Sequence, residues 1–131
     1  MTNPEIIAEL TRIADRNGGI LRAEDVVEAA RNERSPLHPH FDWEDSEAAQ
    51  KWRLHQARQL INVTVTYIED GKKRMPMRVF VSLTPDRKED GGGYRPMVTV
   101  LSDAAQRKQL LEDAMRELKR FEEKYRGLQE L

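Results

Sequence analysis

The stretch that decides the fold is SEAAQKWRLHQARQLIN, residues 46–62. Asp45, directly before it, is a good N-cap, so the stretch is predicted to be a helix. At 100° per residue its apolar side chains fall on two separate faces. One face holds Ala48, Ala49, Trp52 and Leu60, and the other holds Leu54, Ala57 and Ile61. Because a helix that is apolar on two sides packs against neighbours on both, we expect this helix to be central.

One arc of the same helix remains polar, and its residues after Glu47 are Lys51, His55, Arg58 and Asn62. Their spacing of 4, 3 and 4 aligns them along the helix. Side chains of these types can hydrogen-bond to the phosphates and base edges of DNA. A solvated helix face is the plainer interpretation, and both remain open at this point.

Residues 63–84, VTVTYIEDGKKRMPMRVFVSLT, alternate between apolar and polar on both sides of Asp70-Gly71, which is a strong tight-turn signal. They therefore predict a β-hairpin with Lys72, Lys73 and Arg74 at or beside its tip. Pro76 indicates an irregular or edge position in the second strand. The basic tip suits phosphate contact, but charge that protects a sheet edge explains it equally well.

The remaining segments complete an α+β domain. Residues 2–19 predict a helix that Asn3 caps and that Asn17-Gly18-Gly19 ends, and residues 23–33 predict a second helix after a short extended link. Residues 85–95 are expected to form a flexible loop because they contain three consecutive glycines. PMVTVL, residues 96–101, is expected to be a third antiparallel strand beside the hairpin.

The C-terminal segment predicts a long helix capped by Ser102. Its apolar residues are spaced 3, 4, 3, 4 and 3 apart, as in a heptad seam: Leu111, Ala114, Leu118, Phe121, Tyr125 and Leu128. This seam either packs back onto the sheet or pairs with a second copy, and we favour self-association. The expected division is an α+β domain over 1–102 and a helix over 103–131.

Composition narrows the function classes. The chain has 131 residues, 22 Lys and Arg, 23 Asp and Glu, and no cysteine. Near-zero net charge excludes a histone-like polycation, although residues 63–102 carry seven basic and five acidic side chains. The lack of cysteine excludes disulfides and thiolate chemistry. No signal pattern or membrane-length apolar run is seen, so we expect a cytoplasmic protein.

Candidate sites for catalysis or metal binding are weak. His38, His40 and Asp42 in HPHFDWED are possible zinc ligands, but a proline-rich turn held by Phe41 and Trp43 is the better interpretation. The glycines before Tyr94 and Arg95 lack the Lys-Ser/Thr of a P-loop, and no nucleophile has a traceable His and Asp partner. We therefore expect no enzyme activity, no cofactor and no metal; Tyr94 and Arg95 could contact a partner.

The order helix, short strand, helix, turn, helix and hairpin over about residues 4–84, with GGILRAEDVVEAAR, resembles a winged-helix domain. That resemblance implies that the third helix enters the major groove and the hairpin touches the backbone. SPLHPHFDWEDSEAAQKWRLHQARQLI and LSDAAQRKQLLEDAMRELKRFEEKY resemble small uncharacterised bacteriophage and prophage proteins, which implies a phage setting but transfers no site residue. The expected function is a homo-oligomeric, regulatory or recombination-accessory binder of double-stranded DNA. The rival is an assembly factor that binds a phage or host protein without nucleic acid.

Overall fold

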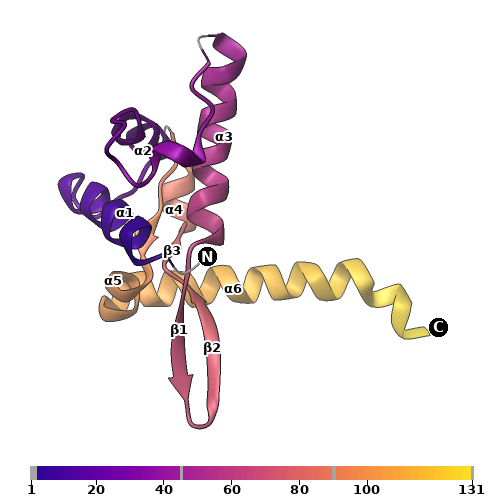
Figure 1. Ribbon diagram of the computed structural model, residues 1–131. Helices are drawn as coiled ribbons and strands as arrows, with labels where there is room; N and C mark the ends of the chain where they lie inside the picture. The colour runs from indigo at the N-terminus through magenta and orange to yellow at the C-terminus, as the bar shows by residue number, and fades with distance from the viewer. Residues whose placement is uncertain (1–2, 45, 90, 131) are drawn as a thin grey trace.

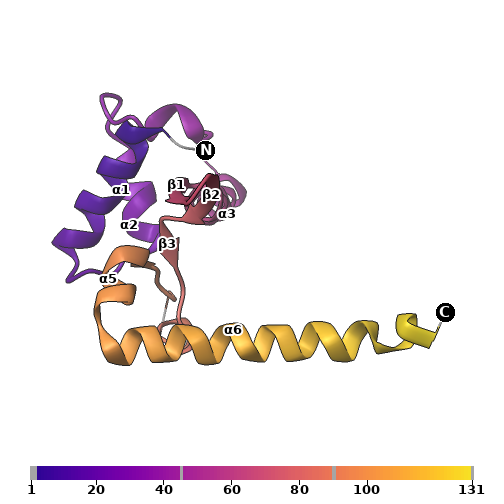
Figure 2. The same cartoon turned by 90° about the horizontal axis from the view of Figure 1, so that it is seen from below.

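The computed structural model describes residues 3–44, 46–89 and 91–130. Its fold is α+β, with a small helical body from which a β-hairpin and a long C-terminal helix project in different directions (Figures 1 and 2). The body is built from α1 (Pro4–Arg16), α2 (Ala23–Ala30) and α3 (Glu47–Val63), and α6 (Ala104–Tyr125) is the long helix. No helix within the described ranges is both long and apolar enough to cross a membrane.

Local signals set the first two helices as expected. The side chain of Asn3 accepts hydrogen bonds from the backbone N–H groups of Glu5 and Ile6, which caps α1. Gly18 and Gly19 follow its end with φ of 66° and 87°, a conformation that glycine adopts at little cost. At the start of α2, Arg22 makes no side-chain cap, and the helix ends at Ala30, three residues before the predicted end.

The third helix begins slightly later than the sequence suggests. Ser46 is the N-cap residue of α3, and its hydroxyl accepts a hydrogen bond from the Ala49 N–H. The predicted cap, Asp45, lies outside the described residues. The turn between α2 and α3 contains η1, a short 3-10 helix over His38–His40.

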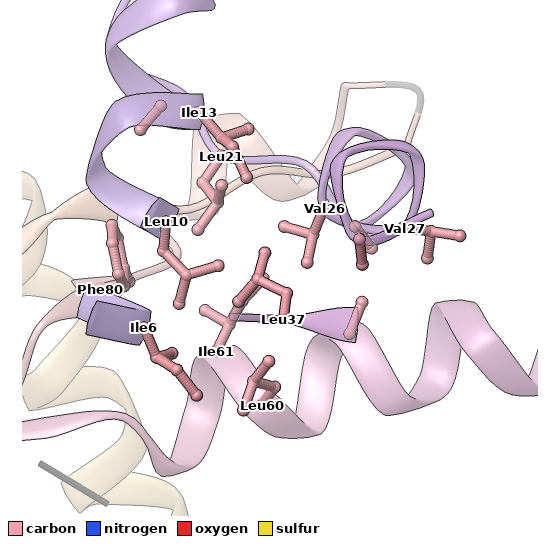
Figure 3. Packing of buried hydrophobic residues seen from close by; sticks show 14 of the residues in the cluster. Ile6, Leu10, Ile13, Leu21, Val26, Val27, Leu37, Leu60, Ile61 and Phe80 are labelled. Carbon is pink, nitrogen blue, oxygen red and sulfur yellow. The ribbon is translucent and has the colours of Figure 1, made fainter. Parts of the chain in front are cut away.

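The main core lies between α1, α2 and α3 and is closed by Phe80 (Figure 3). Its largest fully buried apolar side chains come from all of these elements and from the connections between them: Ile6, Leu10, Leu21, Val26, Leu37, Ile61 and Phe80. Helices α2 and α3 pack closely together along this core. The core therefore fixes the position of α3 through one of its faces.

The hairpin forms as predicted. Strand β1 (Val65–Asp70) pairs with β2 (Lys73–Arg78) antiparallel, with Val65 opposite Arg78. Gly71 occupies the turn with φ of 65°, which is accessible to glycine without strain. Both strands have an open edge, which is compatible with Pro76 in β2.

The predicted three-stranded sheet is not present among the described residues, which contain two separate two-stranded sheets. The second pairs β3 (Phe80–Val81) with β4 (Arg95–Pro96). The chain changes partners at Val79, whose N–H donates to the Thr64 carbonyl while its own carbonyl accepts from Met97 N–H. Pairing of β3 with β4 thus begins where pairing of β2 with β1 ends.

Residues predicted as a third strand instead form α5 (Met97–Ser102). Met97 and Val100, three residues apart, face the same side and pack with Val81 and Leu83 in a second, small core. In a strand, Val100 would lie opposite to Met97, so packing of both against the same small core favours a helical turn. The β-branched residues of this segment indicated a strand, but tertiary packing overrides that local preference.

The glycine-rich loop is more ordered than expected. It starts with α4 (Thr84–Arg87), and Arg95 at its end donates two hydrogen bonds to the carboxylate of Asp86, at 2.7 and 2.9 Å. Tyr94 exchanges backbone hydrogen bonds with Leu21. Both residues therefore have contacts inside the fold, and the expectation that Tyr94 and Arg95 contact a partner stays a prediction.

The long helix is capped by Asp103, whose carboxylate accepts from the Gln106 N–H. Ser102, the predicted cap, is the last residue of α5, and its hydroxyl donates to the Val98 carbonyl instead. Helix α6 runs crosswise to α3 and extends well past the body, ending in η2 (Arg126–Glu130) (Figures 1 and 2).

Candidate nucleic-acid interface

The polar flank of α3 is exposed. All four predicted residues, Lys51, His55, Arg58 and Asn62, are open to solvent. They remain free because the opposite face of α3 carries the buried residues of the helix: Ala49, Arg53, Ala57, Leu60 and Ile61. The flank is therefore available for binding.

The prediction that α3 is covered on two sides is wrong. Trp52 is 48% exposed and Val63 is 50% exposed, so the face that carries them is open. The Trp52 ring lies 5.1 Å from the ring of His55 rather than inside a core. The reason is that α1, α2 and Phe80 all pack on the same side of α3, and the described residues supply no second layer.

The hairpin tip is also exposed and basic. Lys72 lies in the turn, and Lys73 and Arg74 begin β2. The Arg74 guanidinium sits 4.6 Å from the centre of the Tyr67 ring, which orients it along one face of the hairpin. The tip therefore presents positive charge without an ion-pair partner among the described residues.

Helix α3 and the hairpin form one continuous structure that we call the arm, residues 47–78. Figures 1 and 2 show the hairpin continuing the line of α3 rather than folding back beside it. The arm carries seven Lys and Arg (51, 53, 58, 72, 73, 74 and 78) against three Asp and Glu (47, 69 and 70). A chain of net charge −1 thus concentrates an excess of four positive charges in the arm and leaves −5 elsewhere.

The end-to-end arrangement separates the two predicted contact groups. The distance from Lys51 to the end of α3 and then along the hairpin to its tip is about 40 Å, given the rise per residue of a helix and of a strand. One turn of B-DNA is about 34 Å. Lys51 and the tip at Lys72 can therefore reach the same duplex only if the arm lies along it.

A cleft of about 460 Å³ lies at the inner corner between the arm and α6. The arm lines it with Arg58, Asn62 and Arg78, and α4 and α6 line it with Arg87, Asp113 and Glu117. Arg78 donates a hydrogen bond of 2.6 Å to the Asn62 side-chain oxygen. Arg58 has no ion-pair or hydrogen-bond partner within the described part of the chain. The cleft extends the positive surface of α3 towards β2, a link that sequence spacing did not indicate.

Asp113 holds α6 against the floor of this cleft. Its carboxylate accepts from the Thr84 hydroxyl at 2.7 Å, the Thr84 N–H at 3.0 Å and the Gln109 amide at 3.0 Å. Burial alone would raise the pKa of Asp113, but these hydrogen bonds and the charge of Arg87 outweigh it and leave the pKa lowered. Asp113 is therefore an anchor rather than a free acid for catalysis.

The turn that contains His38, His40 and Asp42 is held by aromatic contacts. The His38 ring stacks on Trp43 at 4.9 Å, and its Nδ1 lies 2.8 Å from the Ala30 carbonyl. Phe41 is buried, and the Trp43 indole N–H donates to the His38 carbonyl. The preferred interpretation of HPHFDWED as an aromatic-pinned turn is confirmed for residues 38–44, and Asp45 lies outside the described residues. Within the described ranges, no three His, Asp or Glu side chains are placed to hold a metal ion.

Arg53 is the residue that sequence reasoning missed in this region. It is 2% exposed, and its guanidinium donates to the carbonyl oxygens of Asp42 and Glu44 while it lies 5.3 Å from the Trp43 ring. It therefore binds the long turn to α3. The sequence did contain a signal for this burial, because Arg53 lies on the inner face of the helix, between Ala49 and Ala57.

The apolar seam of α6 is uncovered in the single chain. Its large residues are 40 to 61% exposed: Leu111, Leu118, Phe121, Tyr125 and Leu128. Ala114 is exposed too, beside the cleft. Packing of this seam back onto the sheet, one of the two alternatives left open above, does not occur among the described residues.

Comparison with protein-family models, curated proteins and solved structures finds no match to this chain. The class of protein is therefore defined by geometry alone: a small α+β chain with a basic helix–hairpin arm and a long, separate apolar helix.

Proposed function

We propose that this chain is a non-enzymatic protein that binds double-stranded DNA through its arm. The observation that carries the proposal is the concentration of four excess positive charges on one exposed helix–hairpin unit of a chain that is otherwise acidic. Basic side chains on one surface attract the phosphate backbone and release its counterions. An evenly mixed surface would give no such attraction.

The order of the elements supports a winged-helix variant, in which the hairpin continues the line of α3 instead of folding back beside it. Helices α1, α2 and α3 and the hairpin follow each other in the winged-helix order, with Leu21 as the extended segment between α1 and α2. In this proposal α3 lies in the major groove with Lys51, His55, Arg58 and Asn62 towards the bases and sugar-phosphates. The hairpin then follows the backbone, where Lys72, Lys73 and Arg74 contact phosphates.

The distribution of acidic residues determines which end of the arm we expect to bind DNA most strongly. Asp42, Glu44 and Glu47 are exposed around the N-terminal end of α3, the end that carries Lys51. They repel phosphate there. Arg58 and Arg78, at the corner with the hairpin, are farther from these acids. We therefore assign the principal phosphate contacts to the C-terminal half of α3 and the hairpin.

The resemblance to phage and prophage proteins supports a regulatory or recombination-accessory role in phage-encoded DNA metabolism. Such a role requires DNA binding without catalysis, and the side-chain types of the arm suit binding. The arm offers cations, an imidazole and an amide, which suit contacts to phosphates and base edges.

The proposal is tested by anisotropy of a labelled 20-base-pair duplex at low and moderate salt. Lys51→Ala/Arg58→Ala is expected to weaken binding at least tenfold at low salt, since charged contacts to phosphate are lost. The matched control is Lys108→Ala/Lys119→Ala, which removes the same charge from exposed positions of α6. Equal affinity of the arm variant and wild type removes the groove assignment of α3.

A second function is favoured by one observation: the exposed apolar face of α6. If wild-type protein does not bind duplex at low salt, the rival role as an assembly factor that binds a phage or host protein becomes the better proposal. In that role α6 and the loop after α4 would form the contact surface, and the arm would be a solvated projection.

A further inference from the structure

Helix α6 carries an apolar face that its own chain leaves bare. Leu111 is 60% exposed, Met115 is 64% and Phe121 is 61%, and the C-terminal half of the helix projects past the body (Figure 2). The body contacts α6 through Leu110 and Asp113, in the N-terminal half of the helix. A contiguous apolar face of this kind marks an interaction surface.

We propose that this face binds α6 of a second copy of the chain in antiparallel orientation. The pairing is centred between Leu118 and Phe121, so that Leu118 of one copy packs on Phe121 of the other. This proposal goes beyond DNA binding and stands without it. It commits to a direction as well as to a partner, because the two directions give different contacts.

Side-chain size favours the antiparallel direction. In that direction, small Ala114 lies opposite large Tyr125 of the second copy, and Leu118 lies opposite Phe121. A parallel pair would place Ala114 against Ala114 and Phe121 against Phe121, which leaves a void at one layer and crowding at another. Well-packed interfaces avoid both.

Charge favours the same direction. Glu117 and Lys124 flank the apolar face on one edge, both are exposed, and neither has an ion-pair partner among the described residues. Antiparallel pairing brings Glu117 of each copy beside Lys124 of the other, twice over. Parallel pairing would bring Glu117 beside Glu122 of the second copy, also twice, and like charges repel.

The surface is large enough for a specific dimer. Each copy offers five large apolar side chains on α6 that are 40 to 64% exposed: Leu111, Met115, Leu118, Phe121 and Tyr125. At about 100 Å² each, the pair buries roughly 1,000 Å², which is the least area expected of a specific interface with good complementarity.

The first test is sedimentation equilibrium of the full chain without DNA. At a protein concentration of about 50 to 100 micromolar, wild type is expected to be dimeric, given an interface of this size. The Leu118→Glu variant is expected to be monomeric, with an unchanged far-UV circular dichroism spectrum. Glu117→Lys and Lys124→Glu should each weaken association several-fold, and the double charge reversal should restore it. A monomeric wild type overturns the proposal.

Direction is tested separately. In a parallel pair Glu117→Lys would strengthen association, because the new lysine would meet Glu122, so stronger association overturns the antiparallel assignment. Disulfide trapping gives a second readout, since the chain contains no native cysteine. A mixture of Glu117→Cys and Lys124→Cys proteins is expected to cross-link between the two, with little cross-linking of either alone.

Discussion

Thr84 and Asp113, which are 29 positions apart in the chain, are joined by two hydrogen bonds: the Thr84 hydroxyl and N–H both donate to the Asp113 carboxylate, at 2.7 and 3.0 Å. Thr84 begins α4 and Asp113 lies in the first half of α6. Together with the small core around Val100, this contact determines where α6 leaves the body and therefore where its apolar face is presented.

Replacing Asp113 with Ala is expected to loosen α6 from the body. The substitution leaves the partly buried Thr84 N–H without its acceptor, and hydrogen bonds to a charged group of this kind contribute about 1.5–3 kcal/mol. We expect a loss of roughly 2–3 kcal/mol in the free energy of unfolding, measured with urea, and faster amide exchange over α4. Glu112→Ala, at an exposed neighbouring position, is the control and should change stability by less than about 0.5 kcal/mol.

The same carboxylate predicts an acid dependence of stability. Its pKa is lowered in the folded chain, so its contribution is fully present above the ordinary value of 3.8 and is lost as the pH falls below it, through the folded pKa. The difference in unfolding free energy between wild type and Asp113→Asn should therefore be constant near neutral pH and shrink below pH 3.8. A difference that grows on acidification would contradict the assignment.

Arg53 is expected to be a stability residue and not a DNA contact, although it lies in the same helix as Arg58. Arg53→Met removes two hydrogen bonds to the carbonyls of Asp42 and Glu44, and should cost about 2–3 kcal/mol in unfolding free energy. Arg58→Met, at an exposed position, should cost less than about 0.5 kcal/mol. Chemical denaturation of both variants measures this; similar losses would show that the turn is held by other contacts.

The hairpin tip is expected to contribute to affinity through phosphate charge alone. Replacing Lys72, Lys73 and Arg74 with Ala should reduce the slope of log affinity against log salt by about 2–3, since each phosphate contact contributes about 0.9. Discrimination between duplex sequences should be unchanged. The measurement is a salt titration of duplex binding for wild type and the triple variant, and an unaltered slope would remove the tip from the interface.

Much of the local structure follows from neighbouring residues. Asn3, the glycine pair after α1 and Asp70-Gly71 act over two to four positions, so the ends of α1 and the hairpin turn were predicted correctly. The segment 97–102 was predicted wrongly because its apolar residues fit both an alternating and a helical pattern. Packing of Met97 and Val100 against the same small core settled the choice in favour of the helix.

The candidate site shows the same division. The exposed polar flank of α3 and the basic tip were found from spacing and turn chemistry, whereas the corner cleft was not, because it brings together residues 58, 78, 87 and 117 from separate elements. Arg78 faces Asn62 only because the chain turns from α3 directly into β1. No local sequence pattern indicates the direction in which the hairpin leaves α3.

Residue order alone thus indicates α1, α2, α3, α6, the hairpin and the charge of the arm, since caps, turns and periodicity depend on contacts within a few positions. Which faces are covered is a property of the folded chain. Trp52 is bare, Arg53 is buried and the seam of α6 projects into solvent because burial depends on which distant segments meet, as Thr84 and Asp113 do. The contacts between distant segments are determined by the free energy of the whole chain rather than by that of any one segment.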